Sequence, residues 1–328
     1  MPEQRRHPLT HLIQRADEGI GAAPGGGCLT HEIAVGSGPD ADREQATVAE
    51  IALDQAEQGV LIADRTIGDE NDLTQPPAGN LAIAAEGMGE GTGHCKDIDD
   101  FDRYYRHLIL WDETDLEIVG AYRLGEIWKW PQQDSHLLYS AMLFDYAKDA
   151  APIFTAGLEL GRSFVQPEYW GKLSLDYLWQ GIGAYLARHP QVNYLFGPVS
   201  LSQNLPKKAR DLLVTHYGNY YPDPQNLARA KSPYICDGET ATLIAGQATG
   251  DDVDTAFAAL KSQLAFMGVK IPTLYKQYTD LCLPGGTWFC GFNIDENFGH
   301  CVDGLVVVDL GLVKAKKRAR YITQHKMT

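Results

Sequence analysis

The first 95 residues lack any phenylalanine, tyrosine or tryptophan, and the 6 Trp, 16 Tyr and 10 Phe residues all follow residue 100. The same segment is short of positive charge, with 5 Lys and Arg against 16 Asp and Glu. Few aromatic residues and an excess of one charge leave little from which to build a core. We therefore predict an atypical, largely irregular segment over residues 1–95 and a folded domain over residues 96–328. Within the first segment, only the stretch from Ala46 to Ile62 has the apolar spacing of a modest helix.

Several other features are missing, and each excludes a class of protein. No run approaches the ~18–20 apolar residues that span a bilayer, and the N-terminus lacks the apolar core of a secretory signal. The six cysteines form no C-x-x-C pair, so we expect reduced thiols in a cytoplasmic protein. Cys282, Cys290, His300 and Cys301 match no closed zinc-site spacing, so we expect no metal. The net charge of −15 argues against nucleic acid as a partner.

After residue 100 the apolar pattern becomes regular and predicts an α+β fold. Strands are predicted over residues 107–111, 116–124, 158–165, 193–201, 287–294 and 303–310. Helices are predicted over residues 173–188, 206–217, 251–267 and 272–281, with a loop-rich connection over residues 218–250. The order is β-β-β-α-β, then helices, then β-β. It contains too few βαβ units for a doubly wound sheet.

Three stretches together resemble a known family. The first runs from Asp97-Ile-Asp-Asp-Phe-Asp102 to Val119-Gly-Ala-Tyr-Arg-Leu124, and the second is Leu158-Glu-Leu-Gly-Arg-Ser-Phe-Val165. The third runs from Ile271-Pro-Thr-Leu-Tyr-Lys-Gln-Tyr278 through Asp295-Glu-Asn-Phe298 to Asp303-Gly-Leu-Val-Val-Val-Asp309. The set resembles GNAT-superfamily acyltransferases of the hemolysin-like and ornithine-lipid N-acyltransferase branch, which is related to acyl-homoserine-lactone synthases. This resemblance implies a GNAT-like mixed, mostly antiparallel central sheet flanked by helices.

The resemblance also implies acyl transfer from a phosphopantetheine thioester to a small amine. The amine loses a proton as it attacks, so a carboxylate or an ordered water serves as base. Glu159 in the E-x-x-R stretch is the implied base or water-orienting group, and Arg162 is the second implied catalytic residue. By strand alternation, Arg162 points to the opposite face from Glu159 unless a bulge intervenes. The implied substrate-binding residues are Asp99, Asp102, Arg123, Phe164, Val165 and Ser200.

The charged residues of these motifs also have a purely structural interpretation. Asp99, Asp102, Arg123 and Arg162 can form an ion-pair network that holds the N-terminal loop on the sheet. For Glu159 we favour a functional role, because an acidic residue in an apolar strand is costly without a partner.

The acyl donor is suggested by a departure from the family pattern. Coenzyme A-dependent relatives carry a glycine-rich turn that cradles pyrophosphate at a helix N-terminus. Here Tyr169 replaces the first glycine, and Pro167 removes a backbone donor. We therefore expect no bound cofactor and a donor carried by acyl carrier protein rather than by coenzyme A.

An acidic carrier protein requires a basic surface. The candidates are Lys207-Lys208-Ala-Arg210 and Lys314-Ala-Lys-Lys-Arg-Ala-Arg320. The alternatives for these runs are an ordinary solvated face or attraction to the inner membrane surface as a peripheral protein.

The leading hypothesis is an N-acyltransferase that moves a fatty acyl group from acyl carrier protein to a small amine or amino acid, in lipid biosynthesis. One alternative is an acyl-homoserine-lactone-like signal synthase. Another is a catalytically silent GNAT-fold protein that binds a carrier protein or membrane. This alternative stays open because residues 60–95 lack the arginine-rich, aromatic-containing helix that the family places there.

Overall fold

The computed structural model describes residues 48–49, 60–63, 99–112, 117–130, 135–238 and 253–323. Most of the segment predicted as irregular, residues 1–95, lies outside the described residues. The boundary predicted at residue 96 therefore stays a prediction.

An eight-stranded sheet forms the centre of the molecule, in the order β1-β2-β3-β4-β6-β7-β10-β9. Every neighbouring pair is antiparallel except β6 and β7. Two further short strands, β5 and β8, pair separately. The α+β class with a mixed, mostly antiparallel sheet is confirmed. The strands are β1 (Val48–Ala49), β2 (Val60–Ala63), β3 (Arg106–Asp112), β4 (Glu117–Gly125), β5 (Phe144–Tyr146), β6 (Gly157–Val165), β7 (Tyr194–Leu201), β8 (Ala228–Ala230), β9 (Thr287–Asp295) and β10 (Cys301–Asp309).

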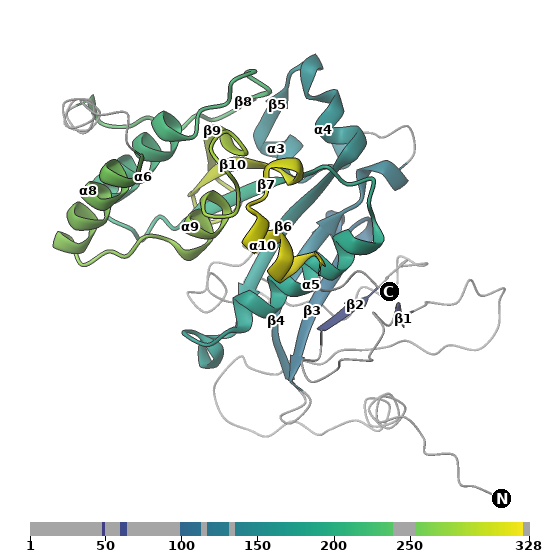
Figure 1. Cartoon of the computed structure of the whole chain (residues 1–328). Helices are drawn as coiled ribbons and strands as arrows, with labels where there is room; N and C mark the ends of the chain where they lie inside the picture. Colours follow the sequence, from purple (N-terminus) through teal and green to yellow (C-terminus); the bar gives the residue numbers. More distant parts are fainter. Residues whose placement is uncertain are drawn as a thin grey trace, which may run out of the picture.

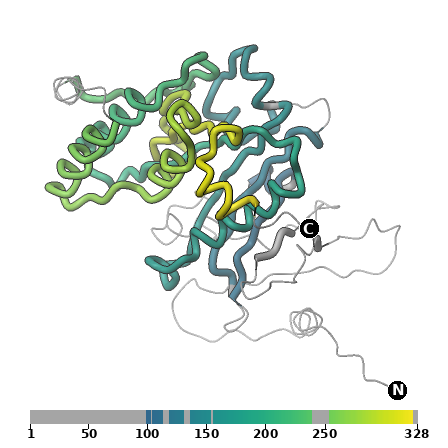
Figure 2. The backbone as a smooth tube through the Cα atoms, viewed as in Figure 1, coloured from purple at the N-terminus to yellow at the C-terminus, as the bar shows by residue number. Residues whose placement is uncertain are grey.

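Helices cover both faces of this sheet. In Figure 1, α5 lies across β3 and β4 with α10 beside it, and α6 and α8 lie together at one side. Figure 2 shows the chain of α8 running back alongside α6, although the two are separated in sequence. The helices are α3 (Ser140–Leu143), α4 (Ala151–Ala156), α5 (Ser174–Arg188), α6 (Lys207–Tyr220), α8 (Val253–Phe266), α9 (Thr273–Thr279) and α10 (Ala315–Tyr321).

Side-chain alternation along β6 separates the two faces. Leu158 and Leu160 are buried in the large core cluster that also contains Leu178 and Ile182 of α5. Glu159, between them, points to the opposite face, where its carboxylate meets the backbone of Tyr139 and Ser140 at the start of α3. The short segment α3–β5–α4 therefore covers the face of β6 that α5 does not.

One prediction about local structure was wrong, and the structure adds detail to two others. The stretch 46–62, predicted as a helix, contains β1 and the first residues of β2, which pairs with β3. The physical reason is that an uncovered edge of β3 needs a hydrogen-bonding partner, and Val60–Ala63 is an apolar, strand-compatible segment. In the connection predicted over 218–250, α6 continues to Tyr220 and β8 adds to β5. The basic run after Lys314, treated as a charged surface, is the helix α10.

Strands β6 and β7 pair only at their beginnings. Their parallel register joins Gly157–Glu159 to Tyr194–Phe196; further along, β6 pairs with β4 and β7 pairs with β10. The two central strands thus diverge after Glu159 and Phe196. We call this opening the splay.

Gly197 lies where the strands separate, and it has a φ of 148°, a conformation that favours glycine. A Cβ built there would lie 2.1 Å from the carbonyl oxygen of Leu160. Gly197 therefore allows the backbone of β7 to approach β6 closely at the start of the splay.

We expect Gly197→Ala to lower the free energy of unfolding by about 1–3 kcal/mol, because the new methyl group must displace backbone. Chemical denaturation measures the change. Gly161→Ala is the matched control on β6, since an added Cβ meets nothing within 4 Å there. Equal losses in the two variants would contradict a specific steric requirement at Gly197.

Candidate active site

A β-bulge at Arg162 shapes the β6 side of the splay. Gly161 pairs with Arg123 and Phe164 pairs with Ala121, so Arg162 and Ser163 together oppose one residue of β4. Arg162 has a φ of 45°, which is unusual for a residue with a side chain. We predicted that Arg162 points away from the face of Glu159 unless a bulge intervenes. The bulge is present, so Arg162 does not follow simple strand alternation.

Arg162 joins a buried ion-pair network, which we call the Arg123 cluster: Asp99, Asp102, His107, Arg123 and Arg162. Arg123 donates two hydrogen bonds to Asp99, of 2.6 and 3.0 Å, and one of 3.1 Å to Asp102. Arg162 donates to Asp99 at 2.9 Å, and the His107 ring lies 3.1 Å from Asp102. The structure therefore brings together four of the predicted site residues, in the network expected from the structural interpretation.

The two arginines differ electrostatically. Burial opposes the charge of Arg123, but Asp102 and Asp99 raise its pKa above the ordinary value. Burial lowers the pKa of Arg162 to about 10, although the attraction of Asp295 and Asp303 opposes that shift. Burial also raises the pKa of Asp99, against the opposing effect of Arg123. Arg123 is thus the stronger structural anchor, and Arg162 is held beside further acidic groups.

Glu159 is completely buried, with no exposed surface. Its Oε1 accepts the N–H of Ser140 at 2.9 Å. Its Oε2 accepts the hydroxyl of Tyr105 and, at 3.2 Å, the N–H of Tyr139. Burial raises the pKa of Glu159 although these donors oppose the shift. Its role as base stays a prediction, and this placement favours anchoring of the α3 segment on β6.

Tyr139, Asp295 and Phe298, for which no role was predicted, complete the surroundings of Arg162. The guanidinium of Arg162 lies 5.5 Å from the ring centre of Tyr139 and 5.0 Å from that of Phe298. The hydroxyl of Tyr139 donates to Asp295 at 2.7 Å. The other oxygen of Asp295 accepts the N–H groups of Asn297 and Phe298, which orders the turn after β9.

Asp303 lies on β10 opposite the predicted substrate-binding residue Ser200 of β7. It is 1% exposed, and its carboxyl group interacts with the Ser200 side chain. Among the residues that the structure describes, none donates a hydrogen bond to its Oδ1. Asp303 belongs to the third motif, but no role was predicted for it. The available signal was an acidic residue at the start of an apolar strand, the same signal that singled out Glu159.

Phe164 and Val165 do not join the charged residues. Phe164 is buried with Ile118 and Ala121, and Val165 packs against the large core cluster. Their predicted contact with substrate stays a prediction.

The turn that follows β6 differs from a glycine-rich cradle. Residues Pro167–Tyr169 form a 3₁₀ turn, and the Tyr169 hydroxyl donates to Asp112 at 3.0 Å. The Lys172 ammonium lies 4.4 Å from the Tyr169 ring centre. Tyr169 is therefore held by side-chain contacts where a pyrophosphate-binding protein would expose backbone N–H groups.

Half of the charges of the two basic runs are paired with acidic residues. Lys207 binds Asp211 at 2.8 Å, Lys314 and Lys317 both bind Asp280 at 2.9 Å, and Arg320 binds Asp176 at 2.6 Å. This pairing lowers the net positive charge that either run offers to an acidic partner.

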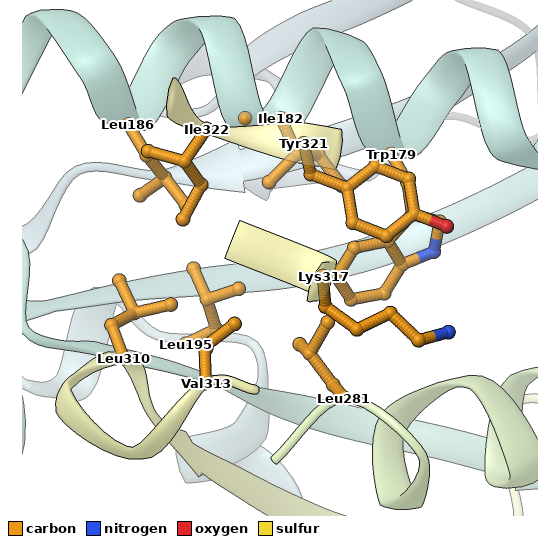
Figure 3. Close-up of a pocket in the computed structure, with 11 residues that line it drawn as sticks. Trp179, Ile182, Leu186, Leu195, Leu281, Leu310, Val313, Lys317, Tyr321 and Ile322 are labelled. Atoms are coloured by element: carbon orange, nitrogen blue, oxygen red, sulfur yellow. The ribbon is translucent and has the colours of Figure 1, made fainter. Parts of the chain in front are cut away.

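An apolar pocket lies between α5 and α10 (Figure 3). Trp179, Ile182 and Leu186 of α5 face Tyr321 and Ile322 across it. Lys317 is the one charged residue that lines this pocket. Because these residues belong to the packing of α10 on α5, the pocket is part of the core. It is not the chemical site.

In the part of the chain that the structure describes, no three histidine, cysteine or acidic side chains converge as metal ligands would. None of the helices there combines the length and apolarity needed to cross a membrane.

Comparison with known proteins finds several that are similar to this chain. Residues 83–180 match the acetyltransferase (GNAT) domain family. Glycine N(alpha)-acyltransferase of Bacteroides thetaiotaomicron is 29% identical over 259 residues, which cover 73% of this chain and 74% of the relative. L-ornithine N(alpha)-acyltransferase of Brucella abortus is 37% identical over 119 residues, which cover 34% of this chain and 41% of the relative. Among solved structures, the CoA-dependent acyl-homoserine lactone synthase MesI aligns over 70% of this chain and 74% of its own, with 10% identity and a TM-score of 0.28. That score is low, so the structural likeness is loose.

Proposed function

We propose that this chain, whose residues 83–180 match the acetyltransferase (GNAT) domain family, transfers a fatty acyl group from a phosphopantetheine thioester to the α-amine of glycine. The observation that carries this proposal is the length of the match. The similarity to the glycine enzyme extends over 73% of the chain, whereas the similarity to the ornithine enzyme extends over 34%. An acceptor of the glycine class is thus supported by most of the folded domain.

The splay supports acyl transfer on geometric grounds. Where β6 and β7 no longer pair, the backbone of each strand is available on the side that faces the other. Backbone N–H groups there can bind the amides of an extended phosphopantetheine arm and the oxygen of the thioester. The closed start of the splay, at Glu159 and Phe196, limits how far the arm enters.

The charge around Arg162 supports an amine acceptor. Four carboxylates, Asp99, Asp102, Asp295 and Asp303, face two guanidinium groups, Arg123 and Arg162. When all are ionised, this set carries two excess negative charges. Such a surrounding attracts an ammonium group rather than the phosphates of coenzyme A.

Acyl carrier protein remains our proposed donor, with use in lipid biosynthesis. The 3₁₀ turn at Pro167–Tyr169 and the Tyr169 contacts offer little to a pyrophosphate. The phosphopantetheine arm of a carrier protein reaches the site without that group.

Thiol release from acyl carrier protein and from acyl-coenzyme A, each with a panel of amines, tests the proposal. We expect the carrier-protein thioester to be preferred over acyl-coenzyme A. We also expect the kcat/KM for glycine to exceed that for ornithine by about tenfold or more, since a site that accepts glycine disfavours a longer side chain. Lysine and S-adenosylmethionine complete the panel. Preference for ornithine would make that amino acid the acceptor, and S-adenosylmethionine turnover would indicate the signal-synthase alternative. If no amine in the panel causes thiol release, the protein is catalytically silent. A preference for acyl-coenzyme A would rule out acyl carrier protein as the donor.

A further inference from the structure

We propose that Asp303 is the proton acceptor for the attacking amine, and that the amine reaches it through the splay between β6 and β7. This inference rests on the proposed function, because it gives a residue to the deprotonation that amide formation requires.

The first argument is the unsatisfied oxygen of Asp303. Buried carboxylates in folded proteins are hydrogen-bonded with few exceptions, because a buried acceptor without a donor destabilises the fold. Oδ1 of Asp303 accepts no hydrogen bond from the described residues, whereas both oxygens of Glu159 accept protein donors. A substrate N–H is the donor that would satisfy this atom. Of these two buried carboxylates, only Asp303 has an oxygen that accepts no hydrogen bond from the described residues.

The second argument is position. The strands diverge after Phe196, and Ser200 lies four residues further along the open part of β7. Asp303 lies directly opposite Ser200 on the neighbouring strand. Asp303 is therefore beside the diverging part of β7, where an extended thioester would present its carbonyl carbon, and Glu159 is at the closed start.

The third argument is the surrounding charge. The groups that act electrostatically with Asp303 are Arg162 from β6, Asp295 from β9, Tyr139 before α3 and Tyr275 from α9. Burial and the nearby Asp295 raise the pKa of Asp303 to about 7, although Ser200 and Arg162 oppose the shift. A carboxylate whose pKa lies near neutral pH takes up a proton more readily than an ordinary aspartate. Geometry and charge thus agree on the same group.

The step balances without a further reactant. The amine nitrogen forms a bond to the thioester carbon, the nitrogen proton passes to Asp303, and the carbon–sulfur bond breaks. The departing thiolate then takes up a proton, and Asp303 returns its own to solvent. The products are an N-acyl amino acid and a free phosphopantetheine thiol.

The test is Asp303→Asn assayed with glycine over a range of pH. We expect kcat to fall by about 10²–10⁴-fold while the KM for the acyl donor stays near that of the wild type. The wild-type kcat should fall as the pH drops below about 7, because only the ionised carboxylate accepts a proton. That acid limb should be absent in the variant. Asp309→Asn is the matched control, since Asp309 lies on the same strand and its bond to the Gly311 N–H is one that asparagine can also accept.

A second acceptor separates loss of the base from loss of the fold. The protonated nitrogen of hydroxylamine gives up its proton far more readily than the ammonium group of glycine. Asp303→Asn should therefore keep most of its turnover with hydroxylamine. Equal losses with both acceptors would overturn the inference, as would glycine turnover within about threefold of wild type with the acid limb intact. A wild-type enzyme inactive with every amine would instead overturn the proposed function, and this inference with it.

Discussion

We expect Arg123→Met to lower the free energy of unfolding by about 3–5 kcal/mol, because it removes the counter-charge that the buried Asp102 and the partly buried Asp99 share. Arg123 is 2% exposed and makes three hydrogen bonds to Asp99 and Asp102. Its guanidinium also lies 5.0 Å from the ring centre of Tyr105. Urea denaturation at neutral pH measures the loss. Arg123→Lys should recover little of it, since an ammonium cannot make the paired contacts to Asp99.

Arg229→Met is the control for this variant. Arg229 is 87% exposed and pairs with Asp145 at 4.0 Å, so its removal should change stability by less than about 0.5 kcal/mol. The deficit of Arg123→Met should also shrink between neutral pH and about pH 5. The reason is that Asp99 and Asp102 take up protons more readily once Arg123 is gone, and the protonated form needs no counter-charge. A deficit independent of pH would indicate that lost packing, and not unpaired charge, dominates.

The second large effect is expected for Glu159→Gln, with a loss of about 2–3 kcal/mol in the free energy of unfolding. The amide of glutamine places a donor against one of three donors that the carboxylate now accepts: the hydroxyl of Tyr105 and the N–H groups of Tyr139 and Ser140. If Glu159 anchors α3, the folded variant should retain kcat within about tenfold of wild type. Thermal denaturation and assays on the folded fraction measure the two quantities.

The same variant tests the alternative role of Glu159. A base at this position would lose about 10²–10⁴-fold in kcat with little loss of stability. That result would return Glu159 to the chemistry and weaken the case for Asp303. Glu168→Gln is the control, because Glu168 is exposed on the 3₁₀ turn after β6 and should change neither quantity.

The main elements of the fold could be predicted from local pattern. The alternation of residues 107–124 predicted the hairpin of β3 and β4, and the apolar spacing of residues 173–188 predicted α5. The buried face of α5 is visible as a helical period, whereas β4, which is buried from Ile118 to Gly125, is visible as an apolar run. The exceptions were short or dependent on distant partners, such as β2, which forms a strand against β3.

The composition of the candidate site was also partly visible. The motifs singled out Asp99, Asp102, Arg123 and Arg162, and the structure joins these four in one network. Asp295 and Asp303 were quoted within motifs but given no role. Their proximity to Arg162 depends on the pairing of β10 with β7 and β9, strands that are distant in sequence from β6.

The sequence by itself therefore determined the class of fold, the order of its main strands and helices, and the charged residues of the motifs. The tertiary structure alone decided three matters. The bulge turns Arg162 toward Asp99, burial closes Glu159 to the outside, and strand pairing sets Asp303 beside Ser200 with one oxygen unsatisfied. The physical reason is that periodicity reports which face a side chain occupies, whereas burial and hydrogen-bond partners depend on residues brought together from distant parts of the chain.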